Sequence, residues 1–237
     1  MIFTAVPLVP VFADVGEAIE TVIPDTPINI EPITPEPIDP PDDGGDKWML
    51  RRATLKCWYS DSNTAYAWVK KPSSVYYEVL DDADGTNIEN RISYAMNEWN
   101  QALSIPFYRT SDSSANIRCV SASYNYFYTN FGIDIDLYSG AYTEYTTVPG
   151  EIVTTSWDGQ EKNIMLLEYA TIYVLHEIRQ KPEWEQNTTM THEFGHALGY
   201  AGHSLNSEDI MLSGSLAQQL TSRDIAHISQ FCCYYKQ

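Results

Sequence analysis

Residues 191–203 read Thr-His-Glu-Phe-Gly-His-Ala-Leu-Gly-Tyr-Ala-Gly-His, and this stretch decides the fold that we expect for the chain. His192 and His196 are four residues apart. On a helix this spacing places both imidazole rings on one face, one turn apart, where they can reach the same metal ion. Glu193 lies beside the first histidine, and His203 follows a glycine-containing break. These components are the ones that a hydrolytic zinc centre requires.

The residue types also indicate how such a centre would work. Neutral imidazole nitrogens hold Zn²⁺ at about 2.0–2.1 Å and leave one position open for water. The metal lowers the pKa of that water toward roughly 7. Glu193 is placed to act as general base and to pass the proton to the leaving amine. The sequence therefore predicts peptide-bond hydrolysis through a zinc-bound water, with His192, His196 and His203 as metal ligands and Glu193 as the catalytic residue.

The helix that carries these residues is expected to begin near Asn187 or Thr188, since either side chain can cap it. Met190, Phe194 and other apolar residues then fall on one face, roughly opposite the two histidines. Gly199 can take a positive φ, end the helix and return the chain toward the metal.

Residues beyond the histidine pair extend the motif. A glycine stands three residues after His196, and Met211 follows the third histidine. The set resembles the metzincin metallopeptidases, and 192–199 (His-Glu-Phe-Gly-His-Ala-Leu-Gly) looks most like the matrixin branch. Residues 97–100, 172–174 and 220–224 stand in matrixin-like order. The resemblance covers about Lys47 to the C-terminus, implies a protein or peptide substrate, and makes Met211 the hydrophobic floor under the metal.

The third histidine departs from the family pattern, which has two residues between the glycine and the third ligand. Here there are three, residues 200–202, and Gly202 stands at the expected ligand position. Glycine gives the backbone freedom for a one-residue bulge. We therefore expect His203 to be the ligand, with Asp209 or water as the alternatives.

The rest of the domain is expected to be α+β, a metzincin-like zincin domain with a twisted mixed sheet of about five strands. A long helix from about Thr86 to Leu103, the active-site helix and a C-terminal helix starting at Thr221 accompany the sheet. The expected strands lie at 53–59, 106–109, 116–121, 151–157 and 170–176. Residues 124–145 hold six tyrosines and are predicted to form a long aromatic loop region.

Two groups of acidic residues have two interpretations. Residues 81–87, and Asp134 with Asp136, are predicted to be turns with solvated carboxylates, with structural Ca²⁺ as the alternative.

The N-terminal part differs in composition from the rest. Residues 1–13 are apolar and end in Val-Phe-Ala, which resembles the end of a signal peptide, although a positively charged start is lacking. Residues 14–46 form a Pro-rich acidic linker or stalk, since residues 1–46 hold nine of the 13 prolines, ten acidic residues and no Lys or Arg. The catalytic domain is expected over 47–237, in a secreted or cell-surface protein; a plain hydrophobic N-terminal segment is the alternative.

Charge and hydropathy limit the partners. The formal net charge is −18, which argues against nucleic acid because no basic stripe is present to neutralise phosphates. The apolar segment is too short to span a membrane, so no transmembrane segment is expected. Nothing in the sequence indicates an oligomeric state.

The four cysteines, Cys57, Cys119, Cys232 and Cys233, form no Cys-x-x-Cys pair, which argues against a cysteine zinc site. One or two disulfides in an exported protein are expected, with free buried thiols as the alternative.

Three functions remain open on sequence grounds. The leading hypothesis is a secreted zinc metalloendopeptidase. The second is a catalytically weak or inactive zinc-containing surface binding protein, motivated by the displaced third histidine. The third is a zinc hydrolase that acts on something other than peptides.

Overall fold

The computed structural model describes residues 55–68, 72–81 and 86–231. The predicted signal-like segment, the Pro-rich linker and the domain start near Lys47 lie outside the described residues, and so do residues 82–85 of the acidic turn. Cys57 and Cys119 carry free thiols. Cys232 and Cys233 lie outside the described residues.

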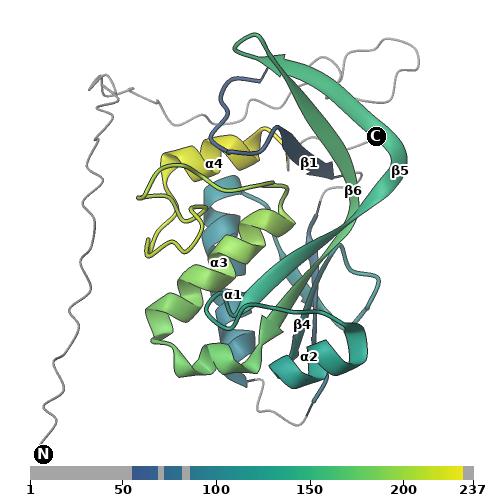
Figure 1. The fold of residues 1–237 in the computed structure, drawn as a ribbon, viewed down its shortest axis with the longest axis vertical. Helices are drawn as coiled ribbons and strands as arrows, with labels where there is room; N and C mark the ends of the chain where they lie inside the picture. Colours follow the sequence, from purple (N-terminus) through teal and green to yellow (C-terminus); the bar gives the residue numbers. More distant parts are fainter. Residues whose placement is uncertain (1–54, 69–71, 82–85, 232–237) are drawn as a thin grey trace, which may run out of the picture. The chain divides into compact units, whose positions relative to one another are not determined.

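The described part of the chain is built from six strands, four α-helices and a short 3-10 helix (Figure 1). The strands are β1 (Thr64–Trp68), β2 (Ser74–Val79), β3 (Tyr108–Thr110), β4 (Ile117–Ala122), β5 (Ala141–Trp157) and β6 (Gln160–Leu175). The helices are α1 (Thr86–Leu103), α2 (Tyr124–Phe131), η2 (His176–Gln180), α3 (Glu183–Ala197) and α4 (Ser222–Ser229). The expected α+β class is confirmed.

The strands form one mixed sheet in which β6 has the most neighbours. β5 pairs with β6 in antiparallel orientation along nearly its whole length. On the other edge of β6, β1 pairs in parallel with residues 163–167 and β4 pairs in parallel with residues 170–175. β2 and β3 continue the sheet beyond β4. The sheet has six strands rather than about five, because β1 and β2 were not among the expected strands.

Side chains of β4 alternate between the two faces of the sheet, as the period of a strand requires. Ile117 and Cys119 belong to the main core, together with buried residues of α1 and α3, whereas Val120 and Ala122 pack around Phe127 of α2. Helix α1 spans the range predicted for it, and it buries an apolar stripe that consists of Ile88, Ile92, Ala95, Trp99 and Leu103. Helices α1 and α3 therefore cover one face of the sheet and α2 covers part of the other.

The strand predicted at 53–59 is wrong over the described residues 55–59, which have no strand structure. Their backbone N–H groups bond to side chains of the C-terminal helix region instead of to a neighbouring strand. Lys56 donates to Gln230 Oε1 at 2.7 Å, and Tyr59 donates to His227 Nδ1 at 3.1 Å. Leu55 and Trp58, three residues apart, are the buried residues of this segment, and the first strand of the sheet is β1.

The predicted aromatic loop at 124–145 is also wrong in part. Residues 124–131 form α2, whose first turn is capped by Ser123 accepting from Tyr126 N–H, and Gly132 ends it with a φ of 67°. β5 begins at Ala141 and continues to Trp157, so the strand predicted at 151–157 is only its distal part.

Helix α3 begins at Glu183, after Pro182, and not near Asn187 or Thr188. Pro182 precedes the first turn, where proline is compatible with a helix start. The C-terminal helix does start where Thr221 predicts. Thr221 accepts from the backbone N–H of Asp224, whose side chain accepts from Thr221 N–H in return.

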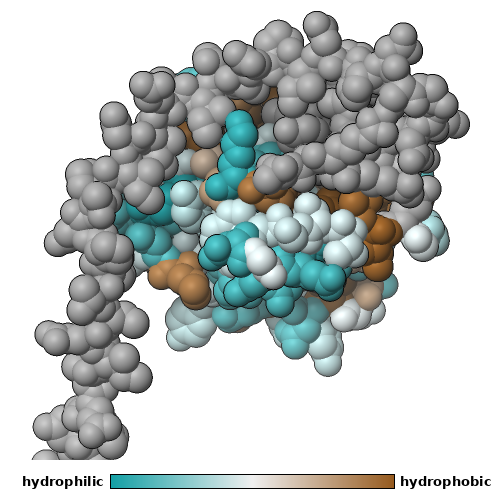
Figure 2. All heavy atoms as spheres, turned by 90° about the horizontal axis from the view of Figure 1, so that it is seen from above, coloured by the Kyte–Doolittle hydropathy of each residue, from teal (hydrophilic) through white to brown (hydrophobic). Residues whose placement is uncertain are grey.

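Among the described residues, no helix has both the length and the apolar character needed to cross a membrane. The face in Figure 2 shows mainly hydrophilic and neutral residues in its visible centre, with hydrophobic residues toward its edges.

We predict that His227 makes the protein sensitive to acid. Its ring is fully buried, and burial, with a smaller effect of Lys162, lowers the pKa of His227 from 6.5 to about 3. Because the folded state then binds fewer protons than the unfolded state, stability is present above pH 6.5 and falls as the pH drops toward 3. This residue should contribute a loss of about 1.4 kcal/mol per pH unit at most.

Urea unfolding of the wild type and of His227→Gln, both in chelator, between pH 7 and pH 4.5 measures this effect. The glutamine carbonyl can still accept from Tyr59 N–H but does not titrate. The wild type should lose stability more steeply than the variant, and parallel pH profiles would contradict the prediction.

Candidate metal centre

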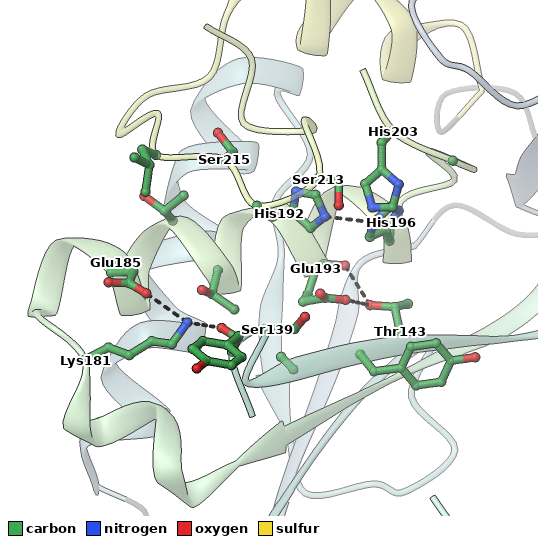
Figure 3. A pocket seen from close by; sticks show the side chains of 18 of the residues that line it. Ser139, Thr143, Lys181, Glu185, His192, Glu193, His196, His203, Ser213 and Ser215 are labelled. Atoms are coloured by element: carbon green, nitrogen blue, oxygen red, sulfur yellow. Dashed lines mark hydrogen bonds and ion pairs between the residues drawn. The ribbon is translucent and has the colours of Figure 1, made fainter. Parts of the chain in front are cut away.

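Three histidine side chains converge at the end of α3. His192 and His196 come from consecutive turns of the helix, and His203 comes from the loop that follows it (Figure 3). One nitrogen from each ring lies within 4.8 Å of the other two. Asp209, the alternative third ligand, is not in this group.

Backbone carbonyls orient the two helical rings. His192 Nδ1 lies 2.7 Å from the carbonyl oxygen of Ile210, and His196 Nδ1 lies 2.7 Å from that of Tyr200. A carbonyl only accepts, so each Nδ1 must carry the proton. The two Nε2 lone pairs of the neutral rings then face each other at 2.9 Å, an arrangement that a bound cation would stabilise.

The protonation states suit a metal site. Burial and the neighbouring His192 hold the pKa of His196 well below its usual value. Burial, followed by His192, also lowers the pKa of His203, against the opposing effect of Asp61. Neutral imidazole is the form that binds a metal, and three such nitrogens with room for a further ligand fit Zn²⁺.

Glu193 is 7% exposed and lies at the floor of the cleft beside the histidines. Its Oε2 accepts a 2.6 Å hydrogen bond from the hydroxyl of Thr143 on β5. Burial raises the pKa of Glu193, whereas His192 and the bond from Thr143 oppose the rise. The carboxyl group is therefore held in one orientation and in a poorly solvated place, as a general base requires.

Met211 packs directly on α3 at Gly195, the residue before His196. It is fully buried, and a Cβ added at Gly195 would lie 2.4 Å from Met211 Sδ and 2.9 Å from Trp99 Cζ2. Only glycine at position 195 leaves room for this contact. The role of Met211 as a hydrophobic floor under the metal stays a prediction.

Buried carboxylates hold the segment that carries Met211. Asp224 of α4 accepts from the backbone N–H groups of Ile210 and Met211, at 3.1 and 3.3 Å. Asp209 is fully buried and accepts from Ser204, Thr221 and Arg223. Asp209 therefore has a structural role and does not join the histidine group. Residues 220–224 belong to the same hydrogen-bond network, because Thr221, Arg223 and Asp224 take part in it.

The cleft in front of the histidines has a volume of about 780 Å³, which is in the range of ligand-binding sites. Tyr66, Tyr142 and Tyr145 line one side of it, and residues 213–216 line another. Beyond the histidines, Lys181 forms an ion pair with Glu185 at 2.9 Å (Figure 3).

The other residues considered for the site lie elsewhere. His176 is buried beside Asp81, at 2.9 Å, and His227 lies on α4, where its ring packs against Trp58 and Tyr200. Asp134 accepts from the hydroxyl of Tyr124, and Asp136 accepts from Tyr138 N–H within its own turn. Among the described residues, the histidine triad is the group that could hold a metal.

Thr143 and Asp61 were not predicted from the sequence. Thr143 precedes Glu193 by 50 residues, and Asp61 precedes His203 by 142. Both are common surface residue types without a motif around them, so only the pairing of distant segments reveals their contacts.

The site combines a helix that carries two histidines one turn apart, a third histidine in the following loop and a buried methionine packed on the same helix. This combination is typical of metzincin-type zinc peptidase domains. The Matrixin family model matches residues 67–232, more than half of the chain, and the protein belongs to this family of metallopeptidases. Comparison with curated proteins gave no match.

We predict that Gly195→Ala destabilises the protein although alanine favours helix by about 1 kcal/mol. The new methyl group would displace Met211 or Trp99, and overpacking of this kind costs about 1–3 kcal/mol. Thermal or urea unfolding in chelator measures the change. Ser93→Ala, at an exposed position of α1, is the control for helix propensity. A Gly195→Ala protein as stable as the control variant would contradict the packing argument.

Proposed function

We propose that the protein is a secreted zinc endopeptidase in which His192, His196 and His203 hold the metal and Glu193 is the general base. The observation that carries this proposal is the convergence of the three rings, with two Nε2 lone pairs facing each other at 2.9 Å. Membership of the Matrixin family supports zinc as the metal and a peptide bond as the target.

A bound zinc ion would supply Lewis acidity, which makes a water molecule more acidic and polarises the scissile carbonyl group. The chain's own residues do the rest. Thr143 holds Oε2 of Glu193 and leaves Oε1 to accept a proton from the attacking water. Glu193 then passes this proton to the nitrogen of the leaving amine. Because Glu193 lies deep in the cleft, bulk water has little access to the transferred proton.

Secretion is part of the proposal. It rests on the apolar segment that ends in Val-Phe-Ala and on the acidic Pro-rich residues that follow it. The catalytically inactive alternative receives less support, since Glu193 is present with the hydrogen bond that orients it.

Digestion of casein by the purified protein, with and without a metal chelator, tests the proposed function. The untreated protein should cleave casein, the chelated protein should not, and added Zn²⁺ should restore cleavage, because the ligands are exposed to the cleft. Zinc content is measured in parallel by atomic emission. Stoichiometric zinc without cleavage of casein, gelatin or a peptide library would favour the binding-protein alternative.

We predict that Glu193→Ala lowers kcat by about 100-fold or more, since a positioned general base contributes roughly 10²–10⁴. The zinc content should remain one ion per chain because Glu193 is not among the converging ligands. Turnover of a fluorogenic peptide and metal analysis check both points. Unchanged turnover would remove the role assigned to Glu193.

We predict that Thr143→Val lowers kcat by about 10- to 100-fold with a smaller effect on KM, because a hydrogen bond to a charged group is worth roughly 1.5–3 kcal/mol. Thr143→Ser keeps the hydroxyl group and is the matched control, with activity expected near that of the wild type. If the valine and serine variants have equal kcat, the hydroxyl group does not position Glu193.

A further inference from the structure

The segment of residues 59–66, here called the N-terminal strap, lies entirely before the region that matches the Matrixin family, which begins at residue 67. It nevertheless contacts the loop that carries the third histidine. The backbone N–H of Tyr66 donates to Gly199 O at 3.0 Å, and the hydroxyl of Ser60 donates to Ala201 O. The hydroxyl of Tyr200 donates to Tyr59 O. The strap thus contacts three consecutive residues of the loop, 199–201.

Asp61 makes the last contacts of this series, and they fall on His203 itself. The backbone N–H of His203 donates to Asp61 Oδ1 at 2.7 Å, and the backbone N–H of Asp61 donates to His203 O at 2.9 Å. Both backbone polar groups of the third histidine are therefore fixed by one residue that is 142 positions earlier in the chain.

The glycines of the loop show how close this approach is. A Cβ on Gly199 would lie 2.1 Å from Tyr66 O, and a Cβ on Gly202 would lie 2.3 Å from Asp61 Oδ1. Gly202 also has a φ of 69°, a conformation that L residues with side chains rarely adopt. Residue 202 therefore faces the strap, and His203 takes the place beside His192 and His196.

These contacts matter because three residues, 200–202, separate Gly199 from His203, one more than in the family pattern. An extra residue next to two positive-φ glycines gives the loop additional conformations, and ordering them costs free energy each time the third ring is placed. A hydrogen-bonded partner that is itself held in place reduces that freedom before a metal binds. Asp61 lies in a bend three residues before β1, which begins inside the strap and is fixed to β6 through residues 64–68.

We propose that the N-terminal strap, through Asp61, is the positioning element that brings His203 to the metal and compensates for the inserted residue. The inference rests on the proposed zinc site and identifies Asp61 as a positioning residue that acts on a ligand through backbone hydrogen bonds. Residues that orient metal ligands typically affect metal affinity by about 10- to 100-fold.

Zinc affinity of the purified full chain tests this proposal by competition with a chromophoric chelator, and the zinc dissociation rate is measured in excess chelator. Asp61→Ala should weaken zinc binding by about 10- to 100-fold. Asp61→Asn keeps an acceptor oxygen for His203 N–H and should stay within about threefold of the wild type, since the orientation is imposed by a hydrogen bond. Asp158→Asn, on the turn between β5 and β6, is the charge-matched control and should bind zinc as the wild type does.

Far-UV circular dichroism of the metal-free proteins separates a local effect from loss of folding. If Asp61→Ala does not fold, Ser60→Ala takes its place. It removes the bond to Ala201 O and the bond that Ser60 Oγ accepts from Ser62 N–H, and it should weaken zinc binding in the same direction. Folded Asp61→Ala, or Ser60→Ala in its place, with the zinc affinity and dissociation rate of the wild type would overturn the inference and leave the zinc site intact. Equal weakening in Asp61→Ala and Asp61→Asn would overturn the hydrogen-bond role. A wild type that binds no zinc would overturn both this inference and the proposed function.

Discussion

The structure depends on two short hydrogen bonds from histidine rings to backbone carbonyls. His192 and His196 can each use only one nitrogen for a metal, and the carbonyls of Ile210 and Tyr200 decide which one. These carbonyls belong to segments that follow the helix, so the active-site helix alone cannot orient its own rings. The loop with Tyr200 and the segment with Ile210 must first pack against the helix, and the hydrogen bonds from Ile210 N–H and Met211 N–H to Asp224 help to hold the second of them there.

Residues 204–221, which include Met211, have little regular structure, so few of their backbone polar groups are paired within a helix or sheet. Buried N–H groups in such a segment need partners. Asp224 supplies two of them from the first turn of α4, where the helix and its capping box also hold the carboxylate in place. Burial raises the pKa of Asp224, whereas its backbone hydrogen bonds act against that rise. Helix α4 thus stabilises the floor of the metal site without contacting the histidines.

Local patterns in the sequence predicted the parts of the fold that local physics determines. The extent of α1 and the start of the last helix at Thr221 follow from periodic or short-range patterns, and both are confirmed. The spacing of His192 and His196 likewise needs only helix geometry. Residues 55–59 were misassigned because their backbone N–H groups bond to Gln230 and His227, which lie 174 and 168 residues away from Lys56 and Tyr59, and no local pattern encodes such partners. The bonds of Thr143 and Asp61 were out of reach because they join segments 50 and 142 residues apart, which no local pattern encodes.

The extra residue in the third-ligand loop shows how an active site and its periphery depend on each other. In the family pattern two residues join the glycine to the third ligand, and a shorter connection has fewer conformations to order. An added residue gives the loop more conformations, and contacts with another part of the chain can restrict them again. Here a segment at the edge of the family domain lies against the loop, and its closeness requires glycine at 199 and 202. The loop and the strap therefore fit only as a pair, so neither can be understood from the metal-binding motif alone.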